Sequence, residues 1–337
     1  MRFFLQRLLR PSGGGDILPL ILTMTDEISA KRDLAEKLLQ KGKYDEAIVL
    51  LEEIHQESPE EDPILLMLSW AYFDSGKLDR AEKCLNILFD RELERKVFTG
   101  FAFDELVRIY KQKKDFLNLV NICEKAAVAQ PDDVGLLNEL GNAYLQSGHY
   151  RQACGIYEKL IEMENDNPFF YCSLGEAFFA AGLYQESEQA YWKAGEIDPD
   201  QHDRYYFKIA TLFQQAQNYR DAERLFNKCV SINPSNPLYY CSLGDCLIGL
   251  DQMKNAQTAY DKAVQVDQAH AGAYYNRLGH SFMKAGKFLQ AADAFQAAIK
   301  HEPVRHYYLN LAAAYREMGL SAAAETIVHE INKIDGN

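Results

Sequence analysis

The stretches PFFYCSLGEAFFAAG (168–182) and PLYYCSLGDCLIGLD (237–251) spell almost the same sequence twice. The offset between their starting positions, 168 and 237, corresponds to two periods of about 34 residues. A looser copy, YFKIATLF at 206–213, stands halfway between them. The chain therefore repeats a unit of about 34 residues, and a fixed period of that size is typical of stacked helical repeats.

The same order of residues continues on both sides of these copies. It runs from an aromatic residue to Leu-Gly or Leu-Ala, to a second aromatic residue, to a Gly-x-Tyr/Phe turn, and ends on Ala, an aromatic, a small residue and Pro. LGNAYLQSGHYRQACGIYEKL (140–160) follows it closely, and so do the units around Gly279 and Ala312. The signal is looser upstream, where Val107 stands at a position that is usually Gly. We count nine units over residues 28–336.

This period and motif resemble the tetratricopeptide repeat family. The resemblance implies an all-α fold, a right-handed α-solenoid superhelix of stacked helix-turn-helix units. Units one and two would occupy 28–95 and units three to nine 100–336. The stretch DRELERKVFTG (90–100) lacks the usual Pro and adds about four residues, so we expect a subdomain boundary near 96–100.

The motif has a physical reading. Each unit is two amphipathic helices, and one unit alone is too short to bury a core of its own. Small residues such as Gly175 and Gly244 permit two helices to approach closely, and aromatic residues such as Tyr191 and Tyr260 fill the space beside them. We therefore interpret the Tyr-rich stretches as packing and not as a cofactor site.

The segment 1–23, MRFFLQRLLRPSGGGDILPLILT, differs from the rest of the chain. Pro11 and three glycines at 13–15 interrupt two apolar patches, and the apolar run at 17–22 is too short to span a membrane. From Met24 the chain becomes charged and helical in pattern. We expect residues 1–23 to be a leader that is disordered or not native, with the folded chain starting at Met24.

Charge and cysteine usage exclude several classes of function. The formal net charge of the 337 residues is −13, which disfavours nucleic acid and an anionic membrane surface as partners. We expect no stable insertion into a membrane. Seven cysteines without a Cys-x-x-Cys pair indicate free thiols in a reducing compartment, so we expect a cytoplasmic protein.

We find no catalytic or metal-binding constellation in the sequence. His301-Glu302-Pro303 followed by His306 misses the H-E-x-x-H spacing by one residue, and Pro303 breaks the helix that this motif needs. Gly13-Gly14-Gly15 lacks the Lys-Ser/Thr of a phosphate loop. We predict that the chain is not an enzyme and holds neither a cofactor nor a metal.

In the tetratricopeptide family the first helix of each unit lines a concave groove that binds a partner protein or peptide. Transferred to this chain, the resemblance predicts a wall of apolar anchors separated by single polar groups. Its residues are Leu66, Trp70, Phe73, Asn138, Asn142, Phe169, Cys172, Glu176, Arg204, Phe207, Lys208, Asp245, Asn276 and His280. Any of the apolar members could instead pack against the next unit.

Some co-chaperones of this family hold a terminal carboxylate with Lys and Asn side chains. The matching positions here are Asn138, Asn142, Ser173, Arg204 and Lys208. Asn138 replaces a cation and Ser173 an amide, so the clamp would be weakened; alternatively, Arg204 and Lys208 only balance nearby acids.

The leading interpretation is a non-catalytic scaffold or adaptor. Three alternatives stay open: a secretion- or assembly-type chaperone that shields an apolar segment, a self-assembling structural protein, and an accessory subunit of an enzyme. The apolar residues of SAAAETIVHEINKI (321–334) have no further capping helix after them, so we expect that a homodimer could form through the C-terminal repeat.

Overall fold

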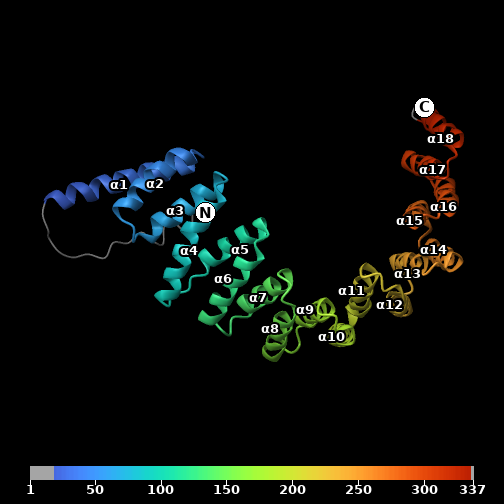
Figure 1. Ribbon diagram of the computed structural model, residues 1–337, viewed down its shortest axis with the longest axis horizontal. Helices are drawn as coiled ribbons and strands as arrows, with labels where there is room; N and C mark the ends of the chain where they lie inside the picture. Colours follow the sequence, from blue (N-terminus) through green and yellow to red (C-terminus); the bar gives the residue numbers. More distant parts are fainter. Residues whose placement is uncertain (1–18, 335–337) are drawn as a thin grey trace. The chain divides into compact units, whose positions relative to one another are not determined.

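The computed structural model describes residues 19–334, and side chains from 27 to 329. In this part of the chain there are eighteen α-helices and two short 3₁₀ turns, and no strand (Figure 1). They form nine pairs: α1 (Pro19–Gln40) and α2 (Tyr44–Glu57), α3 (Asp62–Asp74) and α4 (Leu78–Glu94), α5 (Phe101–Lys113) and α6 (Phe116–Ala129), α7 (Val134–Gln146) and α8 (Tyr150–Met163), α9 (Pro168–Ala180) and α10 (Tyr184–Ile197), α11 (His202–Gln215) and α12 (Tyr219–Ile232), α13 (Pro237–Gly249) and α14 (Met253–Val266), α15 (Ala271–Lys284) and α16 (Phe288–His301), and α17 (Arg305–Glu317) and α18 (Ser321–Ile334). The predicted all-α fold of nine helix pairs is confirmed.

The helix pairs belong to two compact units, one up to Ala143 and one from Tyr144 onward. The division falls inside α7, whereas the subdomain boundary expected near 96–100 lies within the first unit. The extra residues there lengthen α4 to 17 residues, against 14 in α2 and α6. They also form the short loop 95–100, which contains Lys96 with a φ of 55° and ends at Gly100.

Helix α1 begins at Pro19, five residues before the expected start at Met24. The rest of the predicted leader, 1–18, lies outside the described residues. The described contacts that hold α1 to α2 come later: Ala35 is fully buried, and Lys31 pairs with Glu53 at 3.3 Å.

Close helix packing explains the recurrent glycines of the second unit. A Cβ atom added to Gly175 would lie 2.7 Å from the Tyr191 ring, and one added to Gly244 would lie 2.6 Å from the Tyr260 ring. Both tyrosines are almost wholly buried and stand sixteen residues after the glycine. Only glycine leaves room for a ring to lie across the backbone of the first helix.

Other repeats fill the same two positions with side chains whose sizes are divided differently between the first and the second position. A larger first residue goes with a smaller second one, as Ser69 does with Leu85 and Val107 with Cys123, and all four are buried. Val107, which departs from the motif in sequence, is therefore compensated sixteen residues later. This is what dense packing requires, because an interior tolerates redistribution of volume better than a change in its total.

The turn between the two helices of each pair contains one residue with positive φ. Six of these residues are glycines, and the other three are Lys114, Gln217 and Asp251, with φ of 55°, 60° and 62°. The left-handed conformation ends the first helix and reverses the chain. It strains residues other than glycine.

All seven cysteines are free and buried. Burial raises the pKa of the Cys84 thiol to about 11 and that of Cys123 to about 12. These thiols are therefore core side chains, as their sequence suggested.

Candidate functional site

The first helices of the pairs carry all the residues that the sequence singled out for partner binding. We call the surface that they form the first-helix face and describe it separately for each unit. In the first unit it comprises residues of α3, α5 and the part of α7 up to Ala143; in the second it comprises residues of α9, α11, α13, α15 and α17.

In the first unit, aromatic side chains of α3 are covered by side chains of α5. The Trp70 ring meets that of Phe101 edge to face at 5.7 Å, and the guanidinium of Arg108 lies 3.9 Å from the centre of the Phe73 ring. Leu66, Trp70 and Phe73 are all half-buried. They form a partly covered apolar strip and not a row of free anchors.

Asn138 and Asn142 on α7 are also half-buried. The Asn138 Oδ1 atom is buried without a hydrogen-bond partner among the described residues. Nearby charges belong to Lys111 and Glu139, which form an ion pair of 2.5 Å. Burial, and next the charge of Glu139, raise the pKa of Asp104 above its usual value.

The second unit brings several predicted polar residues into contact between consecutive first helices. Glu176 on α9 pairs with Lys208 on α11 at 3.8 Å, and it accepts a hydrogen bond from the Tyr191 hydroxyl at 3.5 Å. Arg204 on α11 is exposed. One of the two cations of the suggested carboxylate clamp is thus already paired.

Asp245 on α13 is the centre of the densest polar cluster of this face. Its carboxylate accepts hydrogen bonds from Arg277 Nη2 at 2.7 Å, Ser281 Oγ at 2.6 Å and the Tyr260 hydroxyl at 2.5 Å. Arg277 and Ser281 lie on α15, so the cluster joins two first helices. Burial is the main cause that raises the pKa of the Tyr260 hydroxyl far above its usual value, so the hydroxyl remains a donor.

The Tyr260 contact explains the acidic residue of the repeated Leu-Gly-Glu/Asp. Gly244 lets the Tyr260 ring lie across α13, and the hydroxyl of that ring reaches the neighbouring Asp245. Gly175, Tyr191 and Glu176 repeat the arrangement on α9 with a longer hydrogen bond. The motif therefore couples the core to the first-helix face.

Farther along, amide side chains connect α15 to α17. Asn310 Nδ2 donates to Asn276 Oδ1 at 2.8 Å and lies 3.0 Å from His280 Nε2. Sequence reasoning named Asn276 and His280 but missed Asn310, Arg277 and Ser281. The repeat register could have pointed to Asn310, because it stands nine residues before the turn glycine Gly319, as Arg277 does before Gly286.

The apolar residues predicted for this face differ in how exposed they are. Phe169 is 53% exposed, and so is its counterpart in the repeat, Leu238, at 50%. Cys172 is only 3% exposed and belongs to the core, which corrects its expected place on the groove wall. Phe207 is half-buried, with its ring 5.5 Å from Phe226 and 5.2 Å from Tyr239. Both face inward because the neighbouring helix pair covers them.

A buried carboxylate that sequence reasoning missed stabilises the second unit from within. Asp203 accepts hydrogen bonds from the Tyr239 hydroxyl at 2.8 Å, Asn233 Nδ2 at 2.9 Å and the Arg204 backbone N–H at 2.9 Å. Burial alone would raise its pKa, but these three hydrogen bonds outweigh it and hold the pKa below its usual value. We assign Asp203 a structural role.

Within the described part of the chain, no group of three or more His, Cys, Asp or Glu side chains is placed to hold a metal ion. No described helix is both long and apolar enough to cross a membrane.

Known proteins similar to this chain contain the same repeat. The chain is 25% identical over 109 residues to the small glutamine-rich tetratricopeptide repeat-containing protein 2 of Mycosarcoma maydis, covering 32% of this chain and 31% of that protein. It is 26% identical over 111 residues to the serine/threonine-protein phosphatase 5 of Homo sapiens, covering 33% and 20%. It is 23% identical over 223 residues to the protein O-mannosyl-transferase TMTC3 of Mus musculus, covering 63% and 22%. The chain thus spans less than a third of the length of each of these curated relatives.

Two solved structures are similar to half of the chain or more. A tetratricopeptide repeat protein from Parabacteroides merdae ATCC 43184 is 18% identical with a TM-score of 0.47, covering 77% of this chain and 98% of that one. The MamA protein is 20% identical with a TM-score of 0.37, covering 50% and 92%. Models of the tetratricopeptide repeat match residues 38–94, 138–202, 203–236, 238–270 and 276–328. The period, the nine helix pairs and these matches together establish that the chain belongs to the tetratricopeptide repeat family, whose repeats are protein-interaction scaffolds.

Proposed function

We propose that the chain is a non-catalytic scaffold or adaptor whose first-helix face in the second unit binds a segment of a partner protein. One observation carries the proposal: groups of polar side chains join neighbouring first helices, two of which also carry exposed apolar residues, and together we call these groups the row. The row consists of Glu176 with Lys208, Asp245 with Arg277 and Ser281, and Asn276 with Asn310 and His280.

The row supports binding because it is fixed before a partner arrives. Hydrogen bonds between helices hold the side chains in one arrangement, which lowers the entropy lost on association. Neither the Asn276 Nδ2 atom nor the Asn310 Oδ1 atom has a partner among the described residues, and a peptide backbone offers the complementary acceptor and donor. Phe169 and Leu238 would supply the apolar anchors.

The proposal extends to the cell compartment and to chemistry. Buried free thiols are consistent with a reducing, cytoplasmic environment. The absence of a catalytic function remains a proposal, because one similar protein is a transferase by name.

The test is affinity capture on the full chain, with the double variant Phe169→Ser and Leu238→Ser. Both side chains are about half exposed, so the variant should keep its helicity by circular dichroism while losing its specific partner. Truncating an anchor typically costs about 2 kcal/mol of binding or more, which is roughly a thirtyfold loss of affinity. Leu289→Ser is the matched control, because Leu289 is 59% exposed on the second helix α16.

Partners that are lost from the double variant and retained by the control support the proposal. Equal capture by all three proteins contradicts it. A single, otherwise insoluble partner would favour the chaperone alternative, and an enzyme among the lost partners would favour an accessory subunit.

Self-assembly through the C-terminal repeat is the remaining alternative. Ile327 of α18 packs against the core of the second unit, while Leu320, directly before α18, is 46% exposed. Light scattering that gives twice the monomer mass, reduced by Leu320→Lys, would support it.

The carboxylate-clamp hypothesis has its own test. Ser173 is only 7% exposed, whereas Arg204 and Lys208 are both exposed, and Lys208 is already paired with Glu176. Calorimetry should compare an acidic peptide with a free C-terminus and the same peptide amidated. A preference for the free acid that Lys208→Ala abolishes supports the clamp, and equal affinities remove it.

A further inference from the structure

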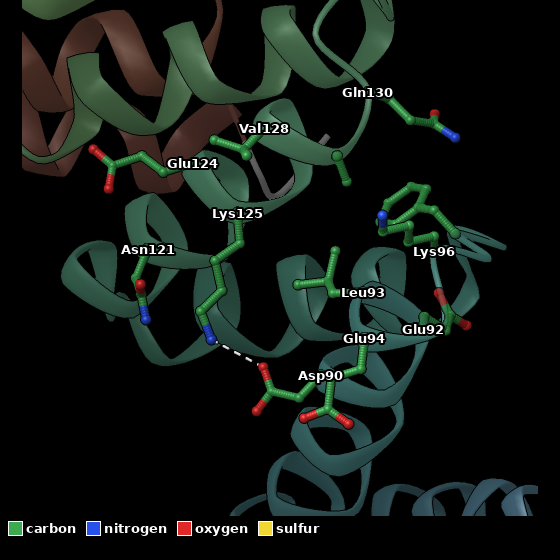
Figure 2. Close-up of a pocket in the computed structure, with 12 residues that line it drawn as sticks. Asp90, Glu92, Leu93, Glu94, Lys96, Asn121, Glu124, Lys125, Val128 and Gln130 are labelled. Carbon is green, nitrogen blue, oxygen red and sulfur yellow. Dashed lines mark hydrogen bonds and ion pairs between the residues drawn. The ribbon is translucent and has the colours of Figure 1, made fainter.

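The first unit has a pocket of about 790 Å³ between the C-terminal ends of α4 and α6 (Figure 2). Leu93 and Glu94 of α4 line one side, Phe98 of the following loop adds to it, and Lys125 and Val128 of α6 line the other. α4 and α6 are second helices of their pairs, so the pocket is distinct from the first-helix face.

The pocket lies where the repeat is irregular. The extra residues after the second repeat lengthen α4 and create the loop 95–100, which a regular repeat would not have. The loop is anchored: the Phe98 ring packs 6.2 Å from Phe89 and 6.0 Å from Phe103, and Glu92 accepts a hydrogen bond from the Thr99 N–H at 3.1 Å. In repeat proteins, insertions often form binding surfaces, and an anchored loop is organised in advance.

The lining of the pocket contains apolar surface that water reaches. Val128 is 82% exposed, a high value for a β-branched apolar residue in the last turn of a helix. Leu93 and Phe98 are half-buried, and Ala129 is exposed. Exposed apolar groups that line a concave surface mark interaction sites more often than single apolar residues on a flat surface do.

The charged groups around this apolar lining are mostly acidic. The lining includes four carboxylates, those of Asp90, Glu92, Glu94 and Glu124, and two ammonium groups, those of Lys96 and Lys125. Lys125 is neutralised by Asp90 at 2.9 Å, the pair marked in Figure 2. The C-terminal ends of α4 and α6 add the negative partial charge of their carbonyl groups. A cationic ligand is therefore favoured at the rim.

We infer that this pocket docks a short amphipathic helix of a partner protein that carries two or three apolar side chains flanked by Lys or Arg. The apolar side chains would contact Leu93, Phe98 and Val128, and the cations would meet Glu94. Helix docking of this kind depends on a few anchors at helical spacing, and the net charge of −13 steers such a segment toward the chain.

The experiment uses the full chain and two fluorescein-labelled 14-residue peptides. One has Leu on one helical face and Lys on the other, and the second has Glu in place of every Lys. Fluorescence anisotropy should show the Lys peptide binding at least about tenfold more tightly than the Glu peptide, with a Kd that rises with salt.

The matched variants are Val128→Lys in the pocket and Leu117→Lys at the other end of α6. Both replace highly exposed apolar residues, at 82% and 74%, so both should fold with unchanged circular dichroism. Val128→Lys should raise the Kd of the Lys peptide by about tenfold or more, and Leu117→Lys should raise it by no more than about twofold.

Equal weakening by the two variants, or none by Val128→Lys, would show that the peptide follows the overall charge and would overturn the inference. So would equal binding of the two peptides. A wild-type chain that is dimeric by light scattering and monomeric as Val128→Lys would make a second copy the occupant. A peptide of residues 1–12 that displaces the Lys peptide from wild type but not from Val128→Lys would make the chain itself the occupant; either result overturns the assignment to a partner.

Discussion

In the first unit the two positions sixteen residues apart are taken by Ser69 with Leu85 and by Val107 with Cys123. In the second unit they are taken by Gly175 with Tyr191 and by Gly244 with Tyr260. Both choices fill a core, because all the larger side chains are buried. Only the Gly–Tyr pairs place a tyrosine hydroxyl there, and this hydroxyl reaches Glu176 or Asp245 on the first-helix face. Two other pairs of the second unit, Ala210 with Phe226 and Gly279 with Phe295, end in a phenylalanine ring instead.

The polar contacts of the two units differ accordingly. Exposed ion pairs join neighbouring helices in the first unit, as between Lys77 and Asp45 at 2.6 Å and between Lys113 and Asp79 at 2.7 Å. The second unit has a buried carboxylate, Asp203, that accepts three hydrogen bonds, and a half-buried one, Asp245, that accepts four. Surface pairs contribute little to stability, whereas a satisfied buried group is costly to disturb. The difference teaches that one repeat motif can hold the side chains between its helices either by exposed ion pairs, which are easily broken, or by buried hydrogen bonds, which are not.

The largest effect is expected from Gly244→Ala. The new Cβ would lie 2.6 Å from the Tyr260 ring and 3.3 Å from the Ala256 carbonyl oxygen, so the ring must shift and its contact with Asp245 is strained. Overpacking of this kind should lower the free energy of unfolding by about 2 kcal/mol, measured by urea denaturation.

Ser69→Ala is the counterpart in the first unit. It removes only a hydroxyl that donates to the Leu66 carbonyl at 2.7 Å, so the expected loss is below about 1 kcal/mol. Adding Tyr260→Leu to Gly244→Ala should recover part of its loss by restoring the volume balance. A double variant that is no more stable than Gly244→Ala alone would argue against this account.

The next largest loss of stability is expected at the buried carboxylate of Asp203, in comparison with an exposed carboxylate. Asp203→Asn replaces an acceptor by a donor facing Asn233, so the chain should lose about 1–2 kcal/mol at neutral pH. Because the folded-state pKa of Asp203 is lowered, its stabilisation is complete above the ordinary value of 3.8 and is lost as pH falls through the folded-state pKa.

Urea midpoints between pH 7 and pH 3 should therefore fall less steeply below pH 4 in the variant than in the wild type. Asp79→Asn, at an exposed carboxylate whose pKa is lowered chiefly by the hydrogen bond from Lys113, should move the midpoint less. The comparison fails if Asp79→Asn costs as much as Asp203→Asn.

A smaller change in stability is expected at the left-handed turn residue, a backbone position that occurs in both units. Lys114 in the first unit and Gln217 in the second hold the left-handed turn conformation without the freedom of glycine. Replacing either with Gly should raise the free energy of unfolding by about 0.5–1 kcal/mol, as the relief of strain exceeds the added entropy of the unfolded chain. Gly76→Ala, at a turn with φ of 77°, should lower it. Loss of stability in both glycine variants would show that their side chains matter more than this strain.

The smallest effect is expected at the N-terminus. A chain that begins at Met24 should unfold within about 0.5 kcal/mol of the full chain, because the described contacts of α1 involve Lys31 and Ala35. A difference of several degrees in the melting temperature would mean that residues 1–23 pack on the repeats.

The sequence by itself determined the repeat, because its signals are local and recur in register. Leu-Gly, the turn glycines and the Ala-aromatic spacing predict two helices per unit and the place of each turn. Even the insertion after unit two could be seen at 90–100, where the Pro is missing. The sequence could not show that Cys172 is buried and Phe169 exposed, since both lie on a first helix at groove-facing spacing.

Only the tertiary structure decided those questions, because they depend on residues from neighbouring pairs. Cys172 and Phe207 are covered by the pairs that follow them, while Phe169 stays exposed. The partners Asp245 and Arg277, or Asn276 and Asn310, belong to successive units and meet only when the pairs stack. The pocket between α4 and α6 likewise arises from where the loop 95–100 packs, which no period in the sequence specifies.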